Sequence, residues 1–346
     1  MTERKYKVIQ WATGNVGSRA LRTAIEHPSL DVVGLWVSSE AKAGKDAGTL
    51  CGLDPVGLAA TTSAADLIAM DADCVLYMRQ GFDLEEACRI LSSGKNIVST
   101  LADLNNPAGL PGETRARLQQ ACKTGGSSLY ATGSSPGFST EALVAPLLSM
   151  QRRLDCVTID EYADVSSRNS PEMLFQIMGF GKSMREYEQA RADALKHHFG
   201  ASMDLVAQEI GLGFDEVVAS GEYAAAKTDT EIAAGTVEAG TIGAMRTTIE
   251  GLHGGKPVMR MRLNWYVTTD IDKAGWDLRE NGWRVVVEGD TPMKVDIAFP
   301  VSAEEYPLFT PGLTAHRPVN AVPYVCEAKP GLLTTLDLPQ ILPRFA

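Results

Sequence analysis

The sequence predicts an α/β protein: an N-terminal domain with a doubly wound parallel sheet, then a second α+β domain containing an open, largely antiparallel sheet. Short apolar strands alternate with amphipathic helices up to about residue 132, and a glycine-rich turn joins the first strand to the first helix. Beyond residue 216, longer strands separated by tight turns replace this alternation. Strands linked by helices pair in parallel through right-handed crossovers, whereas strands joined by short turns pair antiparallel.

In the first domain, β-branched apolar runs mark five strands, and stretches with helical periodicity mark four helices between them. The strands are expected at residues 8–11, 32–37, 74–77, 97–100 and 128–132, and the helices at 16–26, 64–70, 84–93 and 113–124. Gly94 follows the third helix and is expected to cap its C-terminus.

The middle of the chain is expected to form a helix at 140–150, a strand at 155–164, a helix beginning at Ser170-Pro171-Glu172, and one or two helices within 183–210. A serine before a proline, followed by an early acid, is typical of a helix start. Strands follow at 247–252, 258–268, 283–288 and 293–299, the first two joined by the hairpin turn 253–256. A last helix is expected at 313–324.

Residues 7–22, KVIQWATGNVGSRALR, predict what the first domain binds. A strand, a glycine-rich turn and a helix in this order place free backbone N–H groups where they meet a phosphate, as in the Rossmann fold. Gly14 allows close approach of the backbone, Gly17 lets the helix pack on the strand, and Ala12 replaces the usual first glycine. The pyrophosphate-binding residues are predicted to be Ala12, Thr13, Gly14, Asn15, Val16 and Gly17. A purely structural turn is the alternative.

The chain is long enough for two domains, because its 346 residues exceed the usual length of one. We expect a dinucleotide-binding Rossmann domain over residues 1–135 and an α+β domain for substrate binding and dimerisation over residues 136–310. Residues 311–346 are expected to return to the Rossmann domain.

Composition excludes several classes of function. A net charge of −11 without a basic cluster argues against a nucleic-acid partner. No apolar run approaches the roughly 20 residues of a membrane span, and the first strand begins too early to leave room for a signal peptide. The six cysteines are scattered without a CxxC pair, so neither a metal site nor disulfides are expected. These features favour a cytoplasmic protein.

The residues after the second strand bear on the choice of cofactor. Ser38 and Ser39, with Lys42 nearby, suit the 2′-phosphate of NADP, whereas Glu40 could bind the ribose diol of NAD. NADP is therefore the preferred prediction and NAD the other possibility; a solvated loop that binds nothing is the alternative. Met78, Arg79 and Thr100 follow the next two strands and are expected to complete the cofactor site, because ligands bind at the carboxyl ends of a parallel sheet.

The reacting end of the site is expected near Asp103, which follows the fourth strand of the domain and is a candidate proton donor. Solvent exposure or helix capping is the alternative role. Pro136 and Phe138, in the turn GSSPGF, and His316 in the tail are candidate pocket residues. The alternatives are a hinge turn between domains for the first two and a capping or surface role for His316. His197 and His198 occupy a charged helical stretch and are interpreted as surface residues.

Four segments together resemble the 2,4-diaminopentanoate dehydrogenases and the native amine dehydrogenases grouped with them, within the dihydrodipicolinate reductase-like set. These are VIQWATGNVG, STLADLNNP, GSSPGF and AHRPVNAVPYVCEAKPGLLTTLDLPQI. The resemblance implies a homodimer that interconverts an amine with a ketone plus ammonia, using NAD(P)H. It aligns a catalytic glutamate of that family with Asp103, which is shorter by one methylene, roughly 1.5 Å of reach. It also implies that Asn320 lies near the nicotinamide.

The sequence therefore predicts an NAD(P)H-dependent oxidoreductase acting on C–N bonds, with Asp103 holding the amine and moving its proton. Such a proton relay needs the carboxylate to be partly withdrawn from water. A reductase of a carbonyl or conjugated double bond that uses no ammonia is one alternative, and a non-catalytic NADP-binding protein is another. Dihydrodipicolinate reductase itself is disfavoured, since the lysine and the D-A-P-S-G-T run of that enzyme do not follow His197-His198.

Overall fold

The computed structural model describes residues 4–302 and 304–345. The chain forms two units, one made of the residues up to Ala142 together with those from Thr310 onward, the other of Leu143–Phe309. Residues 136–142, which the sequence analysis places in the second domain, thus cluster with the first unit, as does the C-terminal segment.

The first unit contains a six-stranded sheet in which every pairing is parallel. Its strands are β1 (Tyr6–Trp11), β2 (Leu30–Trp36), β3 (Cys74–Tyr77), β4 (Asn96–Ser99), β5 (Ser128–Ala131) and β14 (Gly331–Leu333). They lie in the order β14-β5-β4-β3-β1-β2, so the direction of winding reverses between β1 and β3. A reversal of this kind opens a crevice at the carboxyl ends of the strands.

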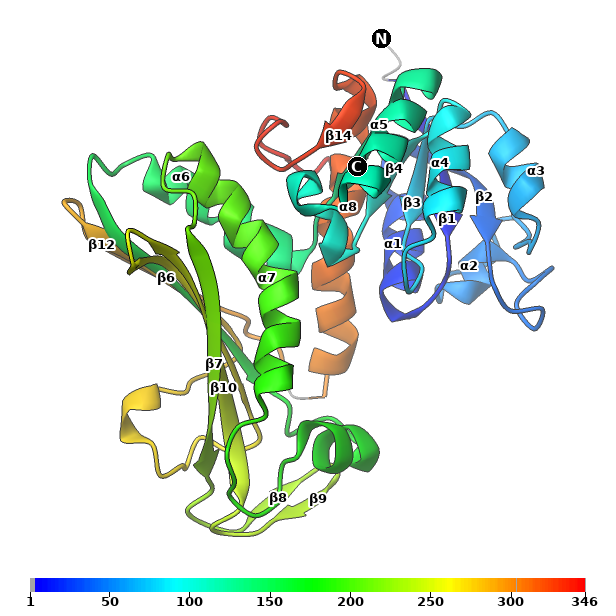
Figure 1. Cartoon of the computed structure of the whole chain (residues 1–346). Helices are drawn as coiled ribbons and strands as arrows, with labels where there is room; N and C mark the ends of the chain where they lie inside the picture. Colours follow the sequence, from blue (N-terminus) through cyan, green and yellow to red (C-terminus); the bar gives the residue numbers. More distant parts are fainter. Residues whose placement is uncertain (1–3, 303, 346) are drawn as a thin grey trace. The chain divides into compact units, whose positions relative to one another are not determined.

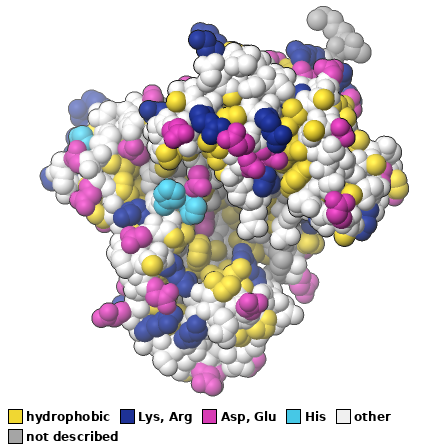
Figure 2. Space-filling model, turned by 45° about the vertical axis from the view of Figure 1, so that its right-hand side comes forward, with side chains coloured by type: hydrophobic (Ala, Val, Ile, Leu, Met, Phe, Trp, Pro, Cys, Tyr) yellow, Lys and Arg dark blue, Asp and Glu magenta, His cyan; other side chains and the backbone are white. Residues whose placement is uncertain are grey.

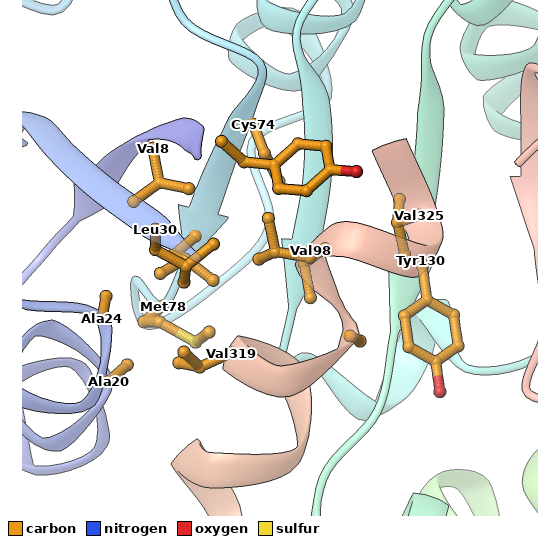
Figure 3. Close-up of a cluster of buried hydrophobic side chains, with 14 of the residues drawn as sticks. Val8, Ala20, Ala24, Leu30, Cys74, Met78, Val98, Tyr130, Val319 and Val325 are labelled. Carbon is orange, nitrogen blue, oxygen red and sulfur yellow. The ribbon is translucent and has the colours of Figure 1, made fainter. Parts of the chain in front are cut away.

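Helices cover both faces of this sheet (Figure 1). They are α1 (Asn15–Glu26), α2 (Ala47–Leu50), α3 (Ala64–Ala69), α4 (Leu84–Ser92), α5 (Gly112–Gly125) and the part of α8 (Tyr306–Glu327) from Thr310 onward. Ala20 of α1 and Val319 of α8 pack with Val8 and Val98 on one face (Figure 3), and α3, α4 and α5 cover the other. Burial on both faces explains why the strands read as continuous apolar runs.

Two features at the end of the chain differ from the prediction. The last helix begins seven residues before the expected residue 313, at Tyr306, and continues through three internal prolines. The sequence analysis also does not predict β14, whose three residues pair in parallel with β5. By contrast, Gly94 follows Ser93, the C-cap residue of α4, and has a φ of +91°, as expected of a capping glycine.

The second unit contains a mixed six-stranded sheet in the order β13-β12-β6-β11-β10-β7. Its strands are β6 (Leu154–Asp164), β7 (Glu216–Ala225), β10 (Ile242–His253), β11 (Lys256–Tyr266), β12 (Gly282–Gly289) and β13 (Met293–Ala298). Four of the five pairings are antiparallel and only β6 with β11 is parallel, which agrees with the predicted largely antiparallel sheet. A two-stranded hairpin, β8 (Thr230–Ile232) with β9 (Gly235–Val237), lies apart from it.

One face of this mixed sheet is apolar and carries the helices α6 (Val144–Leu148) and α7 (Gln189–Glu209), as Figure 1 shows for α7. The helix predicted at 140–150 is divided: the irregular segment η3 (Ser134–Ala142) kinks at Ser135–Gly137 and ends before α6 begins. A single helix, α7, occupies the region 183–210. The remaining short helical segments are η1 (Ala102–Leu104), η2 (Pro107–Gly109), η4 (Glu172–Met178) and η5 (Ala274–Trp276).

Three features concern nucleic-acid binding, membrane spans and metal sites: the surface charge, the helices and the grouping of possible metal ligands. On the face drawn in Figure 2, lysine and arginine side chains are interspersed with acids rather than merged into one basic surface. Within residues 4–302 and 304–345, none of the helices combines the length and the apolar character of a membrane span. The same residues contain no group of three or more His, Cys, Asp or Glu side chains placed to hold a metal ion.

Candidate functional site

The turn between β1 and α1 begins with a residue in an unusual conformation. Ala12 has a φ of +74°, a left-handed conformation that costs a residue other than glycine about 1–2 kcal/mol. Two hydrogen bonds hold it there: its N–H donates to the carbonyl of Trp36 (2.9 Å), and Nε2 of the buried Gln10 donates to the Ala12 carbonyl (2.8 Å). The turn therefore keeps its shape although its first glycine is absent.

The two glycines of the turn have different roles. A Cβ atom on Gly17 would lie 2.4 Å from the carbonyl oxygen of Ala12, so only glycine allows α1 to pack this closely on the turn. A Cβ atom on Gly14 would meet no atom within 4 Å. Gly14 therefore leaves the backbone open on the side from which a ligand can approach.

The N-terminus of α1 is suited to an anion. Gly14 is its N-cap residue, and no side chain caps the N–H groups of the first turn. Those N–H groups and the positive end of the helix dipole attract a phosphate.

A cavity of about 650 Å³ lies at this point, within the size range of small-molecule sites. The residues that line it follow β1, β2, β3 and β4 at their carboxyl ends, on both sides of the reversal between β1 and β3. They are Ala12, Thr13, Gly14, Asn15, Val16, Gly17, Trp36, Val37, Ser38, Ser39, Lys42, Met78, Arg79, Gln80 and Thr100.

Every residue that the sequence analysis assigns to the cofactor lines this cavity except Asn320, which lies half-buried on α8. Three lining residues are not in that prediction: Trp36, Val37 and Gln80. They lie at or shortly after the carboxyl ends of β2 and β3, and this position alone could have identified them as lining residues. The uncapped helix, the open space over Gly14 and the mixture of hydroxyl, ammonium and guanidinium groups fit a dinucleotide.

Lys42 provides a positive charge beside the turn. Its Nζ donates to the carbonyl oxygen of Thr13 (2.8 Å) and lies 3.2 Å from the hydroxyl of the same residue. No carboxylate of the described residues forms an ion pair with it. Ser38 and Ser39 are exposed in the same cavity, whereas Glu40 is not among the residues that line it.

Arg79 enters the cavity from the connection between β3 and α4. Its Nη1 is 2.7 Å from Oε1 of Glu86, and the hydroxyl of Tyr77 donates to the same oxygen (2.8 Å). Glu86 is only 5% exposed. Burial, together with the Glu86 carboxylate, raises the pKa of Tyr77 well above its ordinary value, so the phenol stays a proton donor in this chain of contacts.

Asp103 lies in η1, which follows β4 and contacts β5. It lies three positions after Thr100, the last residue along the chain to line the cavity, and that length of chain spans at most about 11 Å. Its side chain is exposed and does not line the cavity. The first unit thus places Asp103 at the carboxyl edge of the sheet but leaves it in contact with water, in contrast to the expected withdrawal from solvent.

The remaining pocket candidates, on η3 and α8, lie outside the cavity lining. Phe138 lies in η3 with the guanidinium of Arg317 over its ring, 5.8 Å from the ring centre, and Pro136 is half-buried in the same segment. His316 is on α8, where desolvation and the nearby charge of Arg19 lower its pKa. The imidazole is therefore neutral at physiological pH.

Comparison with known proteins places the chain in a family. Residues 138–344 match the model of the 2,4-diaminopentanoate dehydrogenase C-terminal domain, more than half of the sequence. The chain belongs to this family. An amine dehydrogenase of Streptomyces virginiae is 29% identical over 347 residues, which cover 96% of this chain and 95% of that protein.

Solved structures share the fold. An amine dehydrogenase from Mycobacterium smegmatis superposes with a TM-score of 0.75 at 19% identity, covering 99% of this chain and 98% of that one. The WlbA dehydrogenase from Bordetella pertussis, solved with NADH and UDP-GlcNAcA, gives 0.51 at 16% identity, with 94% and 90% covered. The protein is thus an NAD(P)-dependent oxidoreductase of the 2,4-diaminopentanoate dehydrogenase family, with a two-domain α/β fold.

Proposed function

We propose that this protein is an amine dehydrogenase that interconverts a small amine with the corresponding ketone or aldehyde and ammonia, with NADP as its preferred cofactor and NAD as a possible second. The observation that carries the proposal is the cavity at the carboxyl ends of β1–β4, in a chain whose family and relatives are dehydrogenases of amines. The charged residues that line the cavity are Lys42 and Arg79, both cationic, which suits an anionic dinucleotide.

The residues of the turn would hold the cofactor. The N–H groups of Gly14–Gly17 would bind the pyrophosphate at the N-terminus of α1, and Thr100 would lie toward the nicotinamide. When bound, the nicotinamide ring supplies or accepts the hydride. The protein's part is then to bind, orient and exclude water around it.

Lys42 supports the preference for NADP. Its ammonium is held at the cavity by two oxygens of Thr13, neither of which neutralises it. Ser38 and Ser39 add hydroxyl donors nearby. A 2′-phosphate would satisfy all three groups, whereas the diol of NAD would leave the lysine charge uncompensated.

Asp103 would act on the nitrogen of the substrate. Its carboxylate would hold an ammonium by charge, take a proton from the nitrogen as it adds to the carbonyl, and return that proton to the carbinolamine hydroxyl, which leaves as water. Its position after β4, within about 11 Å of Thr100 along the chain, supports this role. The withdrawal from water that a proton relay needs would come from the bound substrate and nicotinamide ring.

We further propose that the protein works as a homodimer in the cytoplasm. We assign the dimer interface to the second unit, and all six cysteines are free thiols, as expected in a reducing compartment. Light scattering during gel filtration tests the dimer: a mass near 74 kDa, twice the 37.1 kDa of the chain, supports it, and a mass near 37 kDa contradicts it.

The decisive experiment is a panel of small ketones and aldehydes assayed with NADPH, with and without ammonium. The proposal predicts NADPH oxidation that depends on ammonium and yields a primary amine, identified by mass spectrometry. Oxidation at the same rate without ammonium, yielding an alcohol or a saturated product, would instead indicate a reductase of carbonyl or conjugated double bonds. Binding of NADPH with no turnover of any substrate would indicate a non-catalytic NADP-binding protein.

A further inference from the structure

Two stacked tryptophan rings and the guanidinium of Arg79 lie between the core of the first unit and the wall of the cavity. The rings of Trp11 and Trp36 lie 5.2 Å apart and within 13° of parallel. Cζ of Arg79 lies over the Trp36 ring, 5.7 Å from its centre. Trp11 is fully buried, whereas Trp36 and Arg79 both line the cavity. Of the three, Trp36 and Arg79 are therefore within reach of a ligand in the cavity.

The carboxylate of Glu86 holds the guanidinium of Arg79 in this position. Glu86 sits in the first turn of α4, where its N–H donates to the N-cap residue Asp83 (3.0 Å) and its carboxylate receives both Arg79 and Tyr77. The Glu86 side chain is 6% exposed and that of Arg79 is 27% exposed. One edge of the guanidinium is thus anchored in the protein while the rest of the group reaches the cavity.

Arg79 and Lys42 differ in how their charges are balanced. Arg79 is paired with the buried carboxylate of Glu86 at 2.7 Å and has Asp83 3.7 Å away. Lys42 has only the two neutral oxygens of Thr13 as partners among the described residues. A phosphate gains more from the lysine, whose charge is not already balanced, than from the neutralised arginine. What Arg79 offers to a ligand is its flat face.

We propose that the guanidinium of Arg79 is the platform on which the adenine ring of the dinucleotide stacks, held by Glu86 and backed by Trp36. The inference rests on the proposed function only in that the cavity holds a nicotinamide dinucleotide. Arg79 would contact the adenine ring, which NAD and NADP share, whereas Lys42 would contact the 2′-phosphate, which only NADP carries. Stacking on a guanidinium or aromatic plane recognises a base without regard to the phosphates it carries.

The experiment is calorimetric titration of the full chain with four probes: ADP, NADH, NADPH and reduced nicotinamide mononucleotide, which lacks adenine. The variant is Arg79→Lys, which keeps the ion pair with Glu86 but loses the planar group, and Lys42→Met is the matched control. Circular dichroism melting establishes that each variant is folded. Glu86→Gln is a second variant, which keeps the arginine but weakens its anchor.

We expect Arg79→Lys to weaken ADP, NADH and NADPH alike, by about five- to tenfold, and to leave the mononucleotide unchanged. Glu86→Gln should have the same pattern with a smaller loss, and Lys42→Met should weaken NADPH alone. The inference is overturned if Arg79→Lys leaves ADP binding intact, if it weakens NADPH but not NADH, or if it weakens the mononucleotide equally. If the unchanged protein binds none of the four probes, the proposed function fails as well.

Discussion

The two sheets of this protein use charge in opposite ways. In the second unit, the face of the mixed sheet opposite α7 carries arginines and acids that neutralise one another: Arg262 contacts the buried Asp160 through two oxygens at 2.6 Å, and Arg260 pairs with Glu250 at 2.7 Å. In the first unit, both faces of the sheet are apolar, and Lys42 faces the cavity without a carboxylate partner among the described residues.

This difference indicates where a ligand binds. A charge that is already balanced within the sheet contributes to the fold and gains little from a new partner. A charge held at a cavity by neutral oxygens is available for an anion. If the cavity holds the cofactor as proposed, the first unit is the part of the molecule that binds it, and the paired charges of the second unit stabilise the fold. The predictions below test this contrast.

The largest effect is expected at Gly17 in the first unit. Gly17→Ala would place a Cβ atom 2.4 Å from the Ala12 carbonyl oxygen, a backbone atom that cannot move without displacing the turn. We expect loss of NADPH binding, by about 100-fold or more, and a stability loss of about 1–3 kcal/mol. Gly14→Ala, where a Cβ atom meets open space, is the matched control for stability: it should melt close to the wild type. Equal NADPH affinity in Gly17→Ala and the wild type would contradict the assignment of the turn.

The next largest effect is expected at Asp160 in the second unit. Asp160→Ala would leave Arg262 without its buried partner, because the Asp160 side chain is only 1% exposed. We expect the free energy of unfolding to fall by about 2–3 kcal/mol, measured by urea denaturation. NADPH affinity at 25 °C should stay unchanged, since the cavity belongs to the first unit. If Asp160→Ala also weakened NADPH binding, the conclusion that the two units use charge differently would be contradicted.

A smaller and selective effect is expected at Lys42. Lys42→Met should raise the Kd for NADPH about tenfold and alter that for NADH little, since only NADPH carries the 2′-phosphate. Fluorescence titration with both cofactors measures the ratio. Equal weakening of the two would show that Lys42 acts only through its bond to Thr13, as a support of the turn.

The smallest effect is expected from His27, at the end of α1. Burial and the nearby charge of Arg344 lower its pKa below 6.5, and its Nδ1 accepts the N–H of Ser29 (3.1 Å). Below pH 6.5 the unfolded chain takes up a proton that the folded chain does not, so stability should fall as pH decreases from 7 to 5. His27→Gln should flatten this slope in urea denaturation at several pH values; an unchanged slope would contradict it.

The sequence predicted the buried strands and helices of the first unit well, but not the pairings between distant parts of the chain, for a physical reason. Strands buried on both faces read as apolar runs, so β1–β5 and α1, α3, α4 and α5 lie within a few residues of their expected positions. The parallel pairing of β6 with β11 and the three-residue β14 depend on contacts between distant parts of the chain, which leave no local pattern. The early start of α8 was missed because prolines usually end a helix.

The site could be predicted where it follows from the topology of the sheet. Residues at the carboxyl ends of β1–β4 were expected to face a ligand, and they line the cavity. Trp36 and Val37 were missed because apolar residues give no chemical signal. Asn320, Pro136, Phe138 and His316 were expected from a resemblance or from their place in the chain, and they lie outside the cavity lining.

The most direct test of the proposed amine chemistry is the rate of NADP+-dependent oxidation of a primary amine by Asp103→Asn, alongside NADPH binding by the same variant. Asparagine keeps the size of the side chain but carries no charge and accepts no proton. We predict loss of turnover by at least about 100-fold, with NADPH affinity within twofold of the wild type. Undiminished turnover with unchanged cofactor affinity would contradict the role of Asp103 and the mechanism built on it.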